Sequence, residues 1–211
     1  MNYIENIFTC ISAPLLIAVL CLRGSRRRML LFLLAGMTAC LLSSYISTFL
    51  AGLKGADRIA ASVEISPVVE EIMKFFPVLF YLLIFDPPRE EVAGGMLMLA
   101  IGFATFENIC YLTANGGAEF SQLLIRGIGT GAAHVVCGVI VAMGLLYLWD
   151  RLWIRIAGTV GLLALAIIYH AVYNLLVSQT GMIARTGYLI PLATILLGLL
   201  FGRKLHRKLN I

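Results

Sequence analysis

Eight side chains of types that suit hydrolytic chemistry lie within the long apolar stretches of this sequence. In chain order they are Glu70, Glu71, Lys74, Glu107, Arg126, His134, His170 and Asn174. A carboxylate can take a proton from water, an imidazole can orient that water, and an Asn or His donor can stabilise an oxyanion. Alternatively, two histidines and a glutamate can hold a zinc ion that activates the water. Spacing leaves both chemistries open.

Helical spacing predicts which of these groups share a face. Glu70 and Lys74 are four residues apart, and Glu71 and Lys74 are three apart, so Lys74 can neutralise either glutamate. Two adjacent carboxylates in a medium of low dielectric cannot both ionise freely. We therefore expect Lys74 to hold one glutamate ionised and the other to serve as a general base. By the same spacing His170 shares a face with Asn174.

Other hydrolase signatures are absent from the sequence. The three aspartates, Asp57, Asp86 and Asp150, lie outside the apolar stretches, which excludes an aspartyl pair within a membrane. Neither an HExxH zinc motif nor a GxSxG nucleophile motif occurs. Cys137 lies one turn after His134, but a cysteine in an apolar run is usually a core residue. A glutamate and histidine site is what remains.

Composition places this site in a membrane. Of the 211 residues, 61% are hydrophobic and 13% are charged, and the mean hydropathy is +0.96. These values exclude a soluble globular domain, a disordered tail, a disulfide-stapled secreted module and a nucleic-acid binder. The basic clusters flank apolar runs and are typical of topology anchors. We expect one integral-membrane domain over residues 1–211, with the lipid bilayer as its surroundings.

The apolar runs predict an all-α, polytopic membrane protein with about seven transmembrane helices. The expected spans are 6–22, 29–50, 67–85, 92–113, 121–149, 156–178 and 188–202, and the catalytic elements lie within 67–178. Turn signals separate them at Asp86-Pro87-Pro88, Asn115-Gly116-Gly117 and Trp149-Asp150-Arg151.

Charge in the loops predicts the orientation. Eleven lysines and arginines lie on the side that holds the C-terminus and three on the other, so the N-terminus is expected outside and the C-terminus inside. Counting about 1.5 Å per residue from the outer ends places the polar groups within about 12 Å of that face, with His134 deeper if its helix begins at Ser121. Four helices thus deliver their polar groups to the outer half of the bilayer.

Four motifs in this order resemble the PrsW family of intramembrane proteases. Glu70-Glu71-Ile72-Met73-Lys74 resembles its EExxK element, and Phe103 to Glu107 resembles its FxxxE element. Arg126 with His134, and His170 with Asn174 as an HxxxN element, complete the set. The wider group contains the CAAX prenyl endopeptidases and the bacteriocin-immunity membrane proteins, whose second motif has a histidine where this chain has Glu107.

The resemblance implies an endopeptidase of a bacterial cytoplasmic membrane that cuts a single-span protein of the anti-sigma factor class near its extracytoplasmic side. Transferred to this sequence, it makes Glu70 the base with Glu71 as a rival, gives water positioning to His134 and Glu107, and gives the oxyanion site to His170 and Asn174. Lys74, Arg126 and Phe103 are supporting residues. If the reaction uses zinc, the candidate ligands are His134, His170 and Glu107.

The sequence leaves two functions of other classes open. A proton-coupled transporter or proton pathway also uses buried carboxylates and histidines, but it predicts polar groups at several depths that reach both faces. A non-catalytic immunity or scaffold protein would retain the motifs without the reaction.

Overall fold

The structure is a computed structural model that describes residues 3–116, 119–148 and 152–209. Within these residues the chain forms helices and no strands, which confirms the all-α prediction. Seven helices are long: α1 (Ile4–Cys21), α2 (Gly24–Lys54), α4 (Ser66–Phe85), α5 (Arg89–Asn115), α6 (Phe120–Tyr147), α7 (Leu152–Val177) and α8 (Met182–Leu209). A short helix, α3 (Arg58–Ala60), and a π-helix, η1 (Ala61–Ile65), precede α4.

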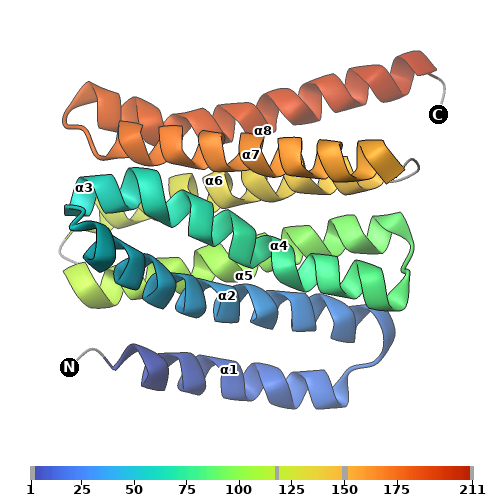
Figure 1. Cartoon of the computed structure of the whole chain (residues 1–211), viewed down its shortest axis with the longest axis horizontal. Helices are drawn as coiled ribbons and strands as arrows, with labels where there is room; N and C mark the ends of the chain where they lie inside the picture. Colours follow the sequence, from blue (N-terminus) through green and yellow to red (C-terminus); the bar gives the residue numbers. More distant parts are fainter. Residues whose placement is uncertain (1–2, 117–118, 149–151, 210–211) are drawn as a thin grey trace.

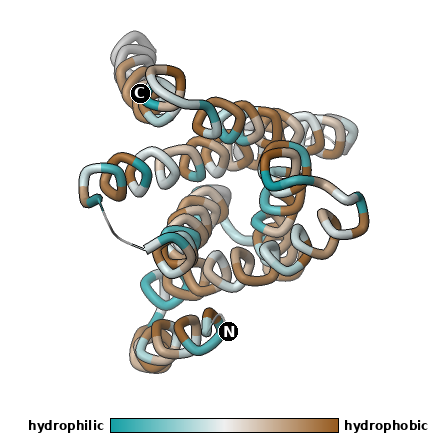
Figure 2. The backbone as a smooth tube through the Cα atoms, turned by 90° about the vertical axis from the view of Figure 1, so that its left-hand side faces the viewer, coloured by the Kyte–Doolittle hydropathy of each residue, from teal (hydrophilic) through white to brown (hydrophobic). Residues whose placement is uncertain are grey.

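The long helices lie side by side along one axis (Figure 1). Helix α5 packs mainly between α2 and α6, while α1 and α8 lie at opposite edges of the bundle (Figure 1). Helix α1 begins at one end of the bundle and α8 finishes at the other, as an odd number of crossings requires. Viewed along the helices from the end that carries α3, hydrophobic residues dominate their length (Figure 2).

Six of the long helices are apolar and long enough to cross a membrane, which confirms a multi-pass membrane protein. The seventh, α4, has 20 residues and carries Glu70, Glu71 and Lys74. Its neighbours α2, α5 and α7 pack around it, so these charges lie among helices. Helix α4 thus brings both glutamates and the lysine of the EExxK motif into the interior of the bundle.

The helix that carries the glutamates begins earlier than predicted. We expected a loop up to its outer end at Pro67, but α3 and η1 continue into α4 from Arg58. Glu70 therefore lies about 18 Å along this helical segment, at 1.5 Å per residue, whereas a helix that began at Pro67 would place it about 5 Å along. Helix α6 likewise begins at Phe120, which selects the deeper of the two predicted positions for His134.

The predicted turns have mixed outcomes. Residues 86–88 connect α4 to α5 and Gly116 ends α5, as predicted. Helix α8 begins at Met182, six residues before the predicted start, so Arg185 lies in its first turn and not in a loop. The Trp149-Asp150-Arg151 turn lies outside the described residues.

Two glycines allow α2 and α5 to touch through their backbones. A Cβ added at Gly36 would lie 2.0 Å from the carbonyl oxygen of Leu99, and one at Gly102 would lie 2.1 Å from that of Leu33. Both distances are far inside van der Waals contact, so any larger residue would push the helices apart. This contact fixes the position of the helix that bears Phe103 and Glu107.

Candidate active site

The predicted residues of α4, α5, α6 and α7 meet in one buried cluster, with Lys74 at its centre. The Lys74 ammonium donates to Glu71 Oε1 at 2.6 Å and contacts His134 Nδ1 at 2.9 Å. Both Lys74 and Glu71 are completely buried. Of the two pairings that the spacing allowed, the structure thus has Lys74 neutralise Glu71.

His134 connects this pair to the carboxylate on α5. Its Nε2 lies 2.7 Å from Glu107 Oε2, on the opposite side of the ring from Lys74. Because the ammonium can only donate, Nδ1 accepts from it and the ring proton is assigned to Nε2, which donates to Glu107. Arg126 contacts the other oxygen of Glu107 at 3.3 Å. The predicted pair of Arg126 and His134 therefore meets through Glu107.

Further contacts hold Arg126 in place. Its guanidinium donates to Asn108 Oδ1 at 2.7 Å and lies 3.6 Å from the ring centroid of Tyr111. Stacked and hydrogen-bonded in this way, Arg126 is a fixed charge next to Glu107.

His170 of α7 lies between the two glutamates of α4. Its Nδ1 is 2.7 Å from Glu71 Oε1, which assigns the ring proton to Nδ1 as the donor. Its Nε2 faces Glu70 Oε2 at 3.7 Å, which is too far for a direct hydrogen bond. Glu70 Oε2 is buried and has no hydrogen-bond partner among the described residues. This oxygen is therefore free to act on a further molecule.

Asn174 lies beside the π-helix and not within hydrogen-bonding distance of the two glutamates. In η1 the Ser66 amide bonds to Ala61, and Pro67 has no amide hydrogen, so neither residue closes a helical turn on the Ser62 carbonyl. The Asn174 amide donates to that carbonyl at 2.8 Å. Asn174 thereby holds the start of the glutamate helix against α7, and its predicted place in the oxyanion site stays a prediction.

Two predicted packing residues border the cluster. Phe103 is fully buried, and the centroid of its ring lies 4.9 Å from that of the His134 ring and 4.8 Å from Lys74 Nζ. Cys137 is also fully buried, and its thiol donates to the Ala166 carbonyl, as a core cysteine would.

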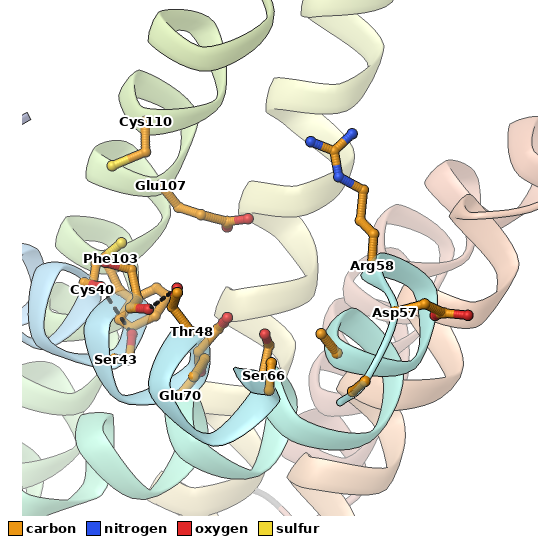
Figure 3. A pocket seen from close by; sticks show the side chains of 15 residues that line it. Cys40, Ser43, Thr48, Asp57, Arg58, Ser66, Glu70, Phe103, Glu107 and Cys110 are labelled. Atoms are coloured by element: carbon orange, nitrogen blue, oxygen red, sulfur yellow. Dashed lines mark hydrogen bonds between the residues drawn. The ribbon is translucent and has the colours of Figure 1, made fainter. Parts of the chain in front are cut away.

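A pocket of about 410 Å³ opens onto the cluster at the end of the bundle that carries α3 (Figure 3). Glu70 and Glu107 line it from α4 and α5, and Arg58 lies across from them in Figure 3. Helix α2 supplies a wall of small polar residues, Ser43, Ser44, Ser47 and Thr48. Glu71 is absent from the lining. The pocket thus reaches one glutamate of the pair, Glu70.

The donor set for a metal differs from the predicted one. Glu70, His134 and His170 bring one ligand atom each to within 4.8 Å of one another. Glu107, the predicted third ligand, is bound instead to His134 and Arg126. Two histidines and a glutamate suit zinc, and a carboxylate behind His170 is a usual support for a metal-binding imidazole. Both nitrogens of His134 are engaged, so it would have to release one contact to act as a ligand.

Three features of the site were not predicted as functional. Asn108 fixes Arg126, Ser47 lies in the pocket wall, and η1 introduces the glutamate helix. The serine and threonine pairs of α2 recur every four residues in an otherwise apolar span, a pattern that could have indicated a polar wall. The proline after the π-helix gave no such signal, because a proline often simply marks the start of a helix.

A comparison of the chain with known protein families agrees with this geometry. Residues 24–200 match a family that is described as PrsW family intramembrane metalloprotease. The match covers most of the chain and all of the clustered residues. The chain belongs to the PrsW family. It is therefore an intramembrane peptidase, and the predicted resemblance to this family is confirmed. No curated protein and no solved structure matches this PrsW-family chain.

Proposed function

We propose that this PrsW-family peptidase cuts a single-span membrane protein near its extracytoplasmic side, with Glu70 as the general base. The observation that supports this most strongly is that Glu70 lines a pocket at one end of the bundle and carries a buried Oε2 with no partner among the described residues. A carboxylate without a partner is costly to bury, and general-base catalysis gives it a use.

Glu70 is a better candidate for the base than Glu71. Glu71 Oε1 accepts hydrogen bonds from both Lys74 and His170, so that oxygen is not available to take a proton from water. Its Oε2 has no partner among the described residues either, but Glu71 is completely buried and does not line the pocket. A peptide bond in the pocket can reach Glu70 and cannot reach Glu71.

The reaction begins with a water next to Glu70 Oε2 and His170 Nε2. The 3.7 Å gap between these atoms suits two groups that both contact one molecule of water. Glu70 takes a proton as the water oxygen attacks the peptide carbonyl, and a tetrahedral oxyanion forms. Glu70 then returns the proton to the leaving nitrogen as the carbon–nitrogen bond breaks. His170 and Asn174 remain our candidates for stabilising the oxyanion. His170 donates from Nε2 only as the doubly protonated imidazolium, because in the neutral ring the single proton is on Nδ1 toward Glu71.

The remaining charged groups hold Glu70 and His170 in position. Glu71 fixes the tautomer of His170, and Lys74 neutralises Glu71. His134 links Lys74 to Glu107, whose charge is balanced by Arg126. Because Glu71, Lys74 and His134 are buried and all of these partners are mutually bonded, the reacting groups need little reorganisation.

The residues present also suit a zinc ion, as the family description implies. Glu70, His134 and His170 would hold it, and it would supply Lewis-acid activation of the water. In that case Glu71 and Glu107 would orient the two histidines from behind.

Topology supports the proposed side of the cut and the proposed location. The excess of basic residues on the side of the C-terminus favours a C-terminus in the bacterial cytoplasm. The pocket lies at the end where α1 begins, which this orientation makes the extracytoplasmic end. A cut there would release the outer domain of a membrane-anchored regulator, and the anti-sigma factor class fits this geometry.

A two-tag reporter with one transmembrane segment tests the proposal. Co-expressed with the peptidase, it should be cut within the outer juxtamembrane residues, as mass spectrometry of both products would show. Glu64→Gln changes an exposed glutamate of η1 and should leave the cut unchanged. A cut on the cytoplasmic flank, or no cut of any candidate regulator, would contradict the proposal.

Metal content separates the two ways of activating water. Zinc bound to purified wild type should be measured together with cleavage before and after chelation. Loss of cleavage on chelation and recovery with added zinc support the metal, provided that His170→Ala also lowers the bound zinc. Full cleavage by metal-free protein supports water activation by Glu70 and His170 alone.

A further inference from the structure

The wall that α2 contributes to the pocket contains one hydroxyl unlike its neighbours. Ser43 donates to the Cys40 carbonyl, Ser44 to that of Leu41, and Thr48 to that of Ser44. Such bonds back to the helix satisfy a hydroxyl internally. Ser47 is only 7% exposed, and its buried hydroxyl has no partner among the residues that the structure describes.

Ser47 lines the same pocket as Glu70 and Glu107. A buried hydroxyl without a hydrogen bond costs free energy. A serine in a helix usually avoids this cost by donating to a carbonyl of the preceding turn, but Ser47 makes no such bond. The pocket is the space in which a partner for this hydroxyl can lie. Two residues that line it from different helices, Ser47 and Glu70, therefore each carry a buried side-chain oxygen without a partner among the described residues.

A peptide presented for hydrolysis needs such partners. Within a helix each backbone carbonyl accepts a hydrogen bond from the amide four residues later, and the surrounding turns shield it from attack. Unwinding the segment exposes amide and carbonyl groups, which are costly in the apolar interior of a membrane unless something replaces the lost bonds. A hydroxyl can serve as donor or acceptor, so it suits either kind of group.

We propose that Ser47 binds a main-chain group of an unwound substrate segment and holds it across the pocket from Glu70. The ligand class is a non-helical stretch of peptide at the outer end of a transmembrane segment. This assignment rests on the proposed function, since it places the substrate in the pocket of Glu70. It makes α2 a substrate-binding element in addition to a packing partner of α5.

Binding of a fluorescent two-tag reporter with one transmembrane segment tests this assignment. The host is the Glu70→Gln variant in detergent, so that no cleavage disturbs the measurement. Adding Ser47→Ala should weaken binding by about threefold to tenfold, the usual effect of one lost hydrogen bond. Ser47→Thr keeps the hydroxyl and should bind within twofold of the host. Thr38→Val removes a back-bonded hydroxyl of α2 away from the pocket and should change nothing.

Thermal unfolding distinguishes a binding role from a structural one. Because the Ser47 hydroxyl has no partner among the described residues of the free protein, Ser47→Ala should leave the unfolding temperature unchanged or raise it. Weaker binding with retained stability supports the proposal. Unchanged binding, or weaker binding with a clear fall in unfolding temperature, overturns it.

The conformation of the substrate gives a second test. Two reporters differ only in a glycine pair or an alanine pair at the outer end of the transmembrane segment. The glycine reporter should bind several-fold more tightly, because glycine lowers the cost of leaving the helix. Tighter binding of the alanine reporter would overturn the unwound segment. Failure of wild type to cleave either reporter would count against the proposed function, while the effect of Ser47→Ala on binding would still decide this inference.

Discussion

The two halves of this helical bundle use the same helices for opposite purposes. Toward α3, helices α4 to α7 carry the charged cluster and the pocket. Toward the turn between α4 and α5, the same four helices bury an apolar core together with Phe32 of α2. The core residues of α4 to α7 are Val78, Leu82, Val92, Met96, Leu99, Cys137, Val141, Ala142, Leu145 and Ala166. One half supplies the packing free energy that lets the other half bury charges.

This division also separates the peptidase from a proton pathway. Beyond the apolar core lies a second polar group, in which Glu91 contacts Arg28 at 2.6 Å and accepts from Tyr81 at 3.1 Å. Between this group and the charged cluster lie, along their helices, Val78 of α4 and Val92, Met96 and Leu99 of α5. A proton relay needs titratable groups at successive depths, whereas this stretch of the described core is apolar.

Removing the central cation should have the largest effect on stability. Lys74→Met leaves the Glu71 carboxylate buried with His170 as its remaining partner. We expect the free energy of unfolding in detergent to fall by about 3–5 kcal/mol, as when one member of a buried ion pair is lost. Adding Glu71→Gln should recover part of the loss. A fall below about 1 kcal/mol would mean that this half is not organised around the pair.

A cavity in the apolar half should affect stability and not chemistry. Leu99 is fully buried, and Leu99→Ala should lower the free energy of unfolding by about 2–5 kcal/mol. Cleavage per folded molecule, measured below the unfolding transition, should remain close to that of wild type. A tenfold loss of this specific activity would show that the two halves are not separable.

A side chain added at the contact between α2 and α5 should have a smaller effect on stability, and one that depends on position. Gly102→Ala places a Cβ against the Leu33 backbone, and we expect about 1–3 kcal/mol of destabilisation from overpacking. Gly131→Ala is the matched control, because a Cβ there meets no atom within 4 Å. Equal unfolding temperatures for the two variants would contradict the close approach.

The sequence was enough to predict the charged cluster, because the cost of burying a charge requires that each charged residue has a partner. A charged residue in an apolar span must find a partner, so the meeting of Glu71, Lys74, His134, Glu107 and His170 followed from their types and positions. Helical spacing allowed Lys74 to pair with either glutamate. The choice of Glu71 depends on how α4 is rotated toward α6 and α7, which local spacing does not determine.

Other features depend on backbone geometry that residue types do not reveal. Pro67 suggested the beginning of a helix, but it lies inside a longer helical segment whose register changes through η1. The spare carbonyl at Ser62 follows from that register, and so does the position of Asn174. Gly36 and Gly102 look like ordinary membrane glycines in the sequence, and only the packing of two helices shows why a Cβ cannot fit.

The central claim is that Glu70 activates the water, and the cleavage rate of Glu70→Gln tests it most directly. The amide keeps the size of the side chain and cannot take a proton, so the rate on a single-span reporter should fall by about 10²–10⁴-fold. The unfolding temperature should be retained, because a neutral group replaces an unpartnered carboxylate oxygen. Glu64→Gln, purified and assayed alongside, should cleave at the wild-type rate. Cleavage by Glu70→Gln within tenfold of wild type would contradict the account.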